Sequence, residues 1–258
     1  MSNLGVILRL NVAREGEGQM QQITRSLEEQ DRLLLSVSDQ LKLPLTQIAR
    51  MAELAQTTGQ TLDYWKEVEV TAAAALSLVE SYALSLRLSS QLERPELAPL
   101  TVSSLLYDTA ESLSPMAKKC GVELQLDTGL RALPVLGDRQ VLLAALSALG
   151  YVFIEGSMTG PDDDPVVLRL SAHRSRYGIV AGIYSSTPGM ATDSLRRARA
   201  LYGRARQPYS QLTFGPAAGV FVADSLLSSL STRLHAARYH KFNGLAVTLT
   251  PGRQLQFV

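Results

Sequence analysis

The stretch from Leu34 to Ala55 constrains the fold of this chain more than any other. Apolar or small residues recur there at intervals of three and four: Leu34, Val37, Leu41, Pro44, Ile48, Met51 and Ala55. Such spacing lines up one stripe of an α-helix, the seam by which helices pack lengthwise against each other. We therefore expect a helix from about Gly18 to Thr58, ended by Gly59.

A second long helix is expected from about Thr61 to Glu93. The same spacing continues through Trp65, Val68, Ala72, Ala75, Val79, Tyr82 and Leu86. Two long helices joined by a tight turn form an antiparallel hairpin, which buries only one face of each helix. The continuous seams favour a four-helix bundle made by two copies of the chain, and hence a homodimer. A bundle completed within one chain is the alternative, although no further helices of this length remain.

Length and composition narrow the class of protein. The 258 residues allow one large or two small domains, and a hydrophobic fraction of 46% is enough for a sizeable core. The formal charge of +1 gives no bias toward nucleic acid or an anionic membrane, so neither is expected as a partner. The single Cys120 excludes an internal disulfide. Without an apolar run of about 18 residues or a signal-peptide pattern, we expect a cytoplasmic protein with no membrane span.

The second half of the chain alternates helices and strands. Two prolines in segment 94–99 mark a linker, because proline cannot continue a helix. Helices are expected at 102–119, 138–153, 192–202 and 219–235, and strands at 122–127, 134–136, 166–172, 178–184, 245–250 and 254–258. The expected organisation is an α+β fold with a short N-terminal strand or tail (1–15), the dimerising hairpin (16–94) and an α/β-sandwich domain (100–258).

The segment 38–45, Ser-Asp-Gln-Leu-Lys-Leu-Pro-Leu, resembles the dimerisation and phosphoacceptor helix of sensor histidine kinases. That family carries Ser-His-Glu-Leu-Arg-Thr-Pro-Leu at this place. The order of elements after residue 100 resembles the family's ATP-binding domain, which gyrases share. Segments 105–124 and 242–251 are similar to the opening helix and strand of that domain and to its last hairpin. The resemblance implies a helical bundle that docks receiver domains, followed by an ATPase-type domain.

Asp39 stands where the family carries its phosphorylated histidine. An imidazole accepts a phosphoryl group well, whereas a surface carboxylate without a metal cluster is a poor nucleophile. Asp39 is therefore an ordinary exposed acid or a fixed negative charge in place of phosphohistidine. The residues around it, Gln40, Lys42, Pro44 and Thr46, keep a surface on which we expect a partner to dock.

The metal-binding helix of the family also appears in altered form. Gly137-Asp138 fits its beginning, but the positions of the magnesium-binding asparagines fall at Ala148 and Val152, and Glu155 stands in the place of a basic residue. The chain has only three asparagines, and none lies in this helix. The hard oxygen ligands that magnesium needs are therefore missing.

The glycine motifs are reduced as well. Ser185 and Gly189 stand where the family reads adenine with Asp-x-Gly-x-Gly, and a serine hydroxyl lacks the charge of that aspartate. Gly215 and Gly219 remain from the phosphate loop, in which Pro216 removes a backbone donor. An ordinary turn between a strand and a helix is the alternative for this loop.

Loss of the acceptor and the metal ligands together predicts no phosphoryl transfer, which depends on positioning and charge stabilisation. The favoured function is a dimeric, catalytically inactive histidine-kinase-like scaffold or adaptor, a pseudokinase of two-component signalling. Its expected partner is a response-regulator receiver domain or another histidine kinase; no catalytic residue, metal or cofactor is assigned. The alternatives are residual nucleotide binding with ATPase or kinase activity, and a phosphotransferase-like adaptor, although such adaptors keep the bundle histidine. Without a sensor domain, input is expected from a partner or a small ligand.

Overall fold

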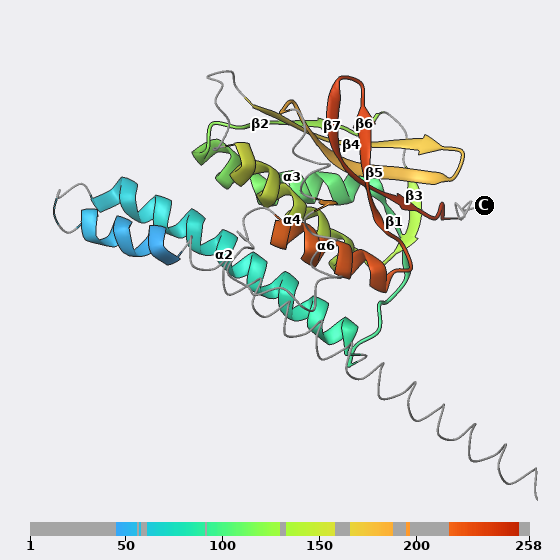
Figure 1. Cartoon of the computed structure of the whole chain (residues 1–258), viewed down its shortest axis with the longest axis horizontal. Coiled ribbons are helices and arrows are strands. Elements are labelled where there is room, and N and C mark those ends of the chain that lie inside the picture. The colour runs from blue at the N-terminus through green and yellow to red at the C-terminus, as the bar shows by residue number, and fades with distance from the viewer. Residues whose placement is uncertain are drawn as a thin grey trace, which may run out of the picture.

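The computed structural model describes residues 45–55, 57, 61–90, 92–129, 133–157, 166–187, 195–196 and 217–252. Residues 45–55 are helical and precede the long helix α2 (Thr61–Ser89). The remaining elements are β1 (Ala98–Thr101), α3 (Val102–Lys119), β2 (Glu123–Asp127), β3 (Pro134–Gly137), α4 (Arg139–Ser157), β4 (Val167–Ser175), β5 (Gly178–Ser185), α6 (Ala217–Ser229), β6 (Leu234–Tyr239) and β7 (Phe242–Leu249). The expected α+β class is confirmed (Figure 1).

The main sheet has five strands in the order β2-β4-β5-β7-β6. Only the β2–β4 pair is parallel; the other neighbours in this sheet are antiparallel. Along β4, the buried Leu168, Leu170 and Ala172 alternate with Arg169 and His173, so one face of the sheet joins the core. Strands β1 and β3 form a separate antiparallel pair, and β1 lies where the chain passes from α2 to α3.

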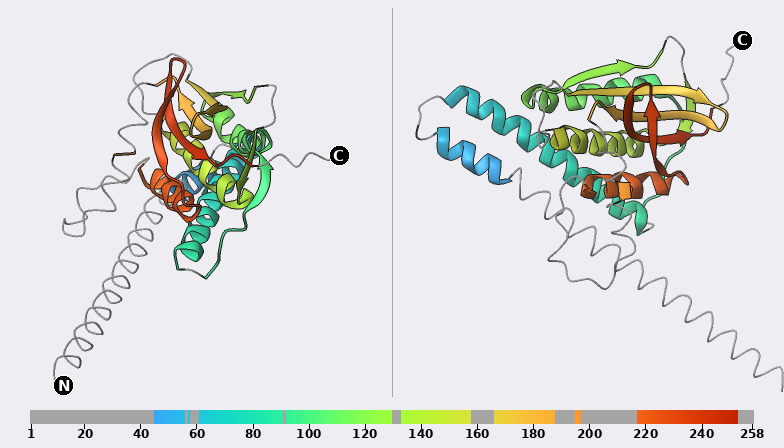
Figure 2. Two further views of the ribbon diagram at one scale, coloured as in Figure 1. Left: turned by 90° about the vertical axis from the view of Figure 1, so that its right-hand side faces the viewer. Right: turned by 45° about the horizontal axis from the view of Figure 1, so that its top comes forward.

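Helices α3, α4 and α6 cover the core face of this sheet, and α2 runs across the outer side of α4 and α6 (Figure 1). Helix α4 is buried on most of its circumference because it lies among α3, α6, α2 and the sheet. The first turns of α2 and segment 45–55 project beyond these layers, as Figure 1 and the right-hand view of Figure 2 show. The second half of α2 thus belongs to the core of the α/β layers.

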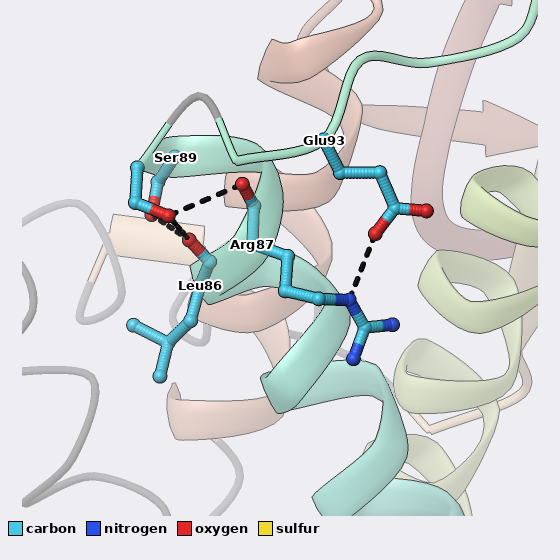
Figure 3. A network of polar contacts seen from close by, with 5 residues as sticks. Leu86, Arg87, Ser89 and Glu93 are labelled. Atoms are coloured by element: carbon cyan, nitrogen blue, oxygen red, sulfur yellow. Dashed lines mark hydrogen bonds and ion pairs between the residues drawn. The ribbon is translucent and has the colours of Figure 1, made fainter.

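Polar side chains define the ends of two helices. Asp138 begins α4: its Oδ1 accepts a hydrogen bond from the Val141 backbone at 3.1 Å, as an N-cap residue does. At the end of α2, the Ser89 hydroxyl donates to the Leu86 carbonyl at 3.0 Å, and Arg87 Nε donates to Glu93 Oε2 at 2.8 Å (Figure 3). The Asp138 contact supplies a partner for a backbone N–H that the helix end leaves unpaired, and the contacts of Ser89 and Glu93 hold the chain as it turns toward β1.

The C-terminal helix is shorter than expected from the sequence. The predicted helix 219–235 ends at Ser229, and residues 234–239 form strand β6 instead. Ser231 takes a left-handed conformation (φ 56°), and the Thr232 backbone N–H donates to the Leu227 carbonyl at 3.2 Å. This is a Schellman ending with serine in the position that glycine usually occupies. The sequence therefore lacks the glycine that would have indicated the end of this helix.

Other bounds differ less. Helix α4 continues to Ser157, beyond the expected end at residue 153. The end of the expected linker, residues 98 and 99, belongs to strand β1, which pairs with β3. Strand β7 forms its hairpin with β6, so segment 242–251 is one strand of the last hairpin and not the whole of it. The expected strand at 1–15, the first part of the first helix, most of helix 192–202 and strand 254–258 lie outside the described residues.

Two helices of the described chain are long and apolar enough to cross a membrane by length and composition, Tyr64–Ser89 and Arg139–Ser157. Within the structure, 44% and 72% of their most apolar windows are buried. Core helices of globular domains pass the same test, and α4 lies in such a core.

Candidate functional site

The docking surface expected around the phosphoacceptor position is described only in part. Thr46 lies in the helical segment 45–55 and is exposed. Asp39, Gln40, Lys42 and Pro44 lie outside the described residues. The helical segment 45–55 that carries Thr46 belongs to the part of the hairpin that projects from the α/β layers (Figure 2).

The apolar seam of α2 divides between two surroundings. Ala75 and Tyr82 are buried, together with Leu78 and Leu84 on the side that faces the rest of the chain. Trp65 and Val79, from the same expected seam, are exposed, Trp65 by 56%. Leu76 lies with them and is exposed by 59%. Helix α2 therefore uses one face within the chain and leaves a second apolar stripe open.

Three polar contacts join the buried face of α2 to three different helices. Lys119 Nζ, at the end of α3, donates to Thr71 Oγ1 at 2.7 Å. Tyr151 of α4 is hydrogen-bonded to Ser77. The Ser85 hydroxyl donates to Ser225 Oγ of α6 at 2.9 Å. These partners follow one another at about two-turn intervals along α2, so the helix is attached along its length and not at one point.

The positions that the resemblance assigns to metal binding at the nucleotide site, which we call the expected nucleotide face, lie in this packed region. Ala148 and Val152 are 1% and 2% exposed and belong to the core cluster that also contains Ala74, Tyr82 and Leu88 of α2. Gly219 is buried in the first turn of α6, while Gly189 and Gly215 lie outside the described residues. Two methyl-bearing side chains buried in an apolar core offer no ligand to magnesium.

Ser185, in the place of the adenine-reading aspartate, ends β5 and is 1% exposed. Its Oγ accepts a hydrogen bond from the Thr187 backbone at 3.1 Å, which closes the turn after the strand. The neighbouring Ser186 exchanges backbone and side-chain hydrogen bonds with Val167. The side-chain hydroxyls of Ser185 and Ser186 at the end of β5 thus already form hydrogen bonds with nearby backbone groups.

A cavity of about 520 Å³ lies elsewhere, where the hairpin meets the C-terminal turns of α3 and α4. We call it the junction cavity. Its described lining includes Met51 and Leu54 of segment 45–55, Leu78 of α2 and Met116 of α3. Its polar lining residues are Gln47, Arg50, Tyr64, Glu67, Lys119, Cys120, Tyr151 and Glu155. Ala148, Val152 and Ser185 are not among its lining residues, so the cavity is not at the expected nucleotide face.

Burial changes the acidity of three groups in the junction cavity. Desolvation raises the pKa of Glu155 above the ordinary value of 4.5. It also raises the pKa of the Tyr151 phenol, against hydrogen bonds from Ser112 and Ser77 that lower it. Desolvation likewise raises the pKa of the Cys120 thiol, partly offset by nearby Lys119. A raised pKa lowers the fraction of thiolate, the nucleophilic form, so the environment of Cys120 does not activate its thiol.

Sequence reasoning named Glu155 only as a mismatch and did not identify the other cavity residues. They come from four helices that are distant in the sequence, so no single stretch of the chain contains the whole lining. Within the described ranges, no three His, Cys, Asp or Glu side chains gather in a way that would hold a metal ion. The cavity is therefore a space with apolar and polar lining residues, in which burial raises the pKa of one carboxyl group, that of Glu155.

No protein-family model matches this chain, and no curated protein matches its sequence. Solved structures do match its fold. The histidine kinase AdeS of Acinetobacter baumannii superposes with a TM-score of 0.51 at 15% identity, over 83% of this chain and 98% of that one. Full-length ShkA in complex with AMPPNP gives 0.51 at 20% identity, over 86% of this chain and 46% of that one.

A structure named as a bacterial phosphotransferase gives a TM-score of 0.48 at 9% identity, over 86% of this chain and 96% of that one. The likenesses to AdeS and ShkA extend through both the hairpin and the α/β layers, which agrees with the resemblance found in the sequence. The chain thus has the fold of a histidine-kinase catalytic core, a helical hairpin followed by an ATPase-type α/β domain.

Proposed function

We propose that this chain is a histidine-kinase-like signalling scaffold that performs no phosphoryl transfer. The observation that carries the proposal is the burial of Ala148 and Val152, at the positions of the metal-binding asparagines, in an apolar core shared with α2. Phosphoryl transfer needs a metal ion to neutralise the developing charge on the phosphates. A face without oxygen ligands, closed by a packed helix, cannot supply one.

The scaffold acts as a dimer in this proposal. The exposed stripe of Trp65, Leu76 and Val79 on α2 has no partner among the described residues and is apolar. Pairing with the same stripe of a second copy would bury it and complete a four-helix bundle. The proposed division of the chain follows: residues 16–94 as the dimerising hairpin and 100–258 as the degenerate ATPase-type domain.

The proposed partner is a response-regulator receiver domain or another histidine kinase in the cytoplasm, docked on the hairpin surface that includes Thr46. Asp39, in the acceptor position, would present a fixed negative charge to the acidic pocket of a receiver domain. Like charges repel at close range unless a metal ion lies between them. Binding should therefore strengthen with magnesium, and Asp39→Asn should reduce that dependence without abolishing binding.

Residual nucleotide binding is the second candidate, because ShkA, which shares this fold, was solved with AMPPNP. One experiment separates the two functions. Thermal unfolding of the full chain is followed with and without millimolar ATP and magnesium, and with the Asp39→His variant in parallel. A ligand at a hundred times its dissociation constant stabilises a protein by about 2.7 kcal/mol.

We expect no shift in melting temperature with either protein, and no radiolabel transfer from ATP to the Asp39→His variant. That variant restores an acceptor but not the metal ligands, so it serves as the matched control for the nucleotide site. A magnesium-dependent shift would support the enzyme, and labelling of the new histidine would show that the ATPase-type domain is active.

A further inference from the structure

The junction cavity has the size and the walls of a small-molecule site. Its volume of about 520 Å³ lies within the range of known ligand pockets. Met51, Leu54, Ala75, Leu78 and Met116 give it apolar walls on three sides. A molecule that fills such a space must have an apolar body, since each buried polar group without a partner is unfavourable.

Of the two carboxyl groups among the described lining residues, Glu67 is exposed and Glu155 is half-buried. Its carboxyl group is desolvated, and no hydrogen bond or ion pair joins it to another described side chain. The nearby ammonium of Lys119 donates to Thr71. Arg50 and Glu67, which also line the cavity, are exposed to solvent and carry opposite charges. A ligand that places a hydrogen-bond donor opposite Glu155, best a positively charged one, would therefore give this carboxyl group a partner.

We propose that the junction cavity binds a small apolar molecule that carries one protonated amine, with the Glu155 carboxylate as the partner of that amine. The apolar body would lie against the methionine and leucine side chains of the hairpin and α3. A buried charge is tolerated when it is paired, and an amine would pair the half-buried Glu155 carboxylate, which has no hydrogen-bond or ion-pair partner among the described side chains.

Such a ligand would contact segment 45–55, α2, α3 and α4 at once. It would therefore bind only when the hairpin lies against the α/β layers as in this structure, and would favour that arrangement by its differential affinity. The site would give the proposed scaffold a direct chemical input. This inference does not depend on the loss of phosphoryl transfer.

Three indole compounds of similar size test the proposal on the full chain by titration calorimetry. Tryptamine carries the amine, tryptophol a hydroxyl and indolepropionate a carboxylate. We expect tryptamine to bind about tenfold more tightly than tryptophol, since a charge-assisted hydrogen bond is about twice as strong as a neutral one. Indolepropionate should bind most weakly.

Two variants locate the binding. Glu155→Gln should bring tryptamine down to the affinity of tryptophol, while Glu111→Gln, an exposed residue of α3 outside the cavity, should change nothing. Ala75→Phe places a ring in the cavity and should weaken all three compounds, with circular dichroism to verify folding.

The proposal is overturned if tryptophol binds as tightly as tryptamine, if Glu155→Gln keeps the preference, or if none of the compounds binds. Competition by ATP for tryptamine would assign the cavity to nucleotide instead. These outcomes are distinguishable from failure of the proposed scaffold function, which is measured by ATP-dependent stabilisation without any indole.

Discussion

The hydroxyl of Ser85 donates a hydrogen bond of 2.9 Å to the hydroxyl of Ser225, a residue 140 positions later in the chain. Ser85 is 1% exposed and Ser225 is half-buried, so the contact is part-buried. It joins α2, the second helix of the hairpin, to α6. The hairpin and the ATPase-type domain are therefore held together by part-buried polar contacts as well as by apolar packing.

Removal of this contact should measurably destabilise the protein. Ser85→Ala leaves the Ser225 hydroxyl without its donor, and we expect a loss of about 1 kcal/mol in the free energy of unfolding. Urea denaturation followed by circular dichroism measures it. Ser114→Ala, an exposed serine of α3, is the matched control and should stay within about 0.5 kcal/mol of wild type.

A double-mutant cycle separates the contact from its surroundings. Ser85→Ala and Ser225→Ala together should destabilise the protein by less than the sum of the two single changes. Strict additivity would mean that the two hydroxyls do not interact in solution.

Gly150 of α4 lies close against Leu113 of α3. A Cβ added at this position would lie within 3 Å of three side-chain atoms of the fully buried Leu113. An exposed Gly→Ala change in a helix stabilises by up to about 1 kcal/mol, but overpacking of this kind destabilises by about 1–3 kcal/mol. We therefore expect Gly150→Ala to lower the free energy of unfolding. A stabilised variant would contradict the observed approach of the two helices.

Glu155 should make stability depend on pH. Burial raises its folded-state pKa above 4.5, so the folded protein binds its proton more tightly than the unfolded chain does. This contribution is fully present below the unfolded pKa and is lost as pH rises through the raised folded pKa. Glu155→Gln removes it.

The variant should consequently gain stability relative to wild type between about pH 4 and about pH 8. Denaturant midpoints at both values measure the difference, with Glu111→Gln as the exposed control. An unchanged difference across this range would show that Glu155 is solvated in the folded protein.

The exposed stripe of α2 should hold two copies together. Light scattering should give twice the chain mass of 28.0 kDa. Leu76→Arg places a charge in the stripe and should yield a folded monomer, because Leu76 is 59% exposed within one chain. Tyr177→Arg, in the exposed turn between β4 and β5, should leave the dimer intact. A wild-type monomer at micromolar concentration would exclude the proposed bundle.

The α/β elements followed largely from local patterns in the sequence. The bounds of α3 match those expected, since its apolar period begins after Thr101 and its end is marked by Lys118, Lys119 and the left-handed Gly121. Strand β6 was missed because Ser231 replaced the usual glycine signal and because its alanines also favour helix. Pairing with β7 decides its conformation, and such a long-range effect is not visible in a short window.

The site was less accessible to sequence reasoning. Absence of asparagine at Ala148 and Val152 is a fact of the sequence, but their burial in one core with α2 is a tertiary fact. The seam of α2 was predicted as one continuous surface, whereas the fold uses Ala75 and Tyr82 within the chain and exposes Trp65 and Val79. The junction cavity arises from four helix faces, none of which shows a binding pattern by itself.

The attachment of α2 gives the hairpin the mechanics of a lever. Its outermost anchor is Thr71, and the free arm from there to Thr61 measures about 15 Å at the rise of an α-helix. A tilt of about 10° at this anchor would move the far end of the arm by about 3 Å, as much as separates a hydrogen bond from no contact. Small adjustments in the packing around the end of α3 would thus be magnified at the surface on which we propose that a partner docks.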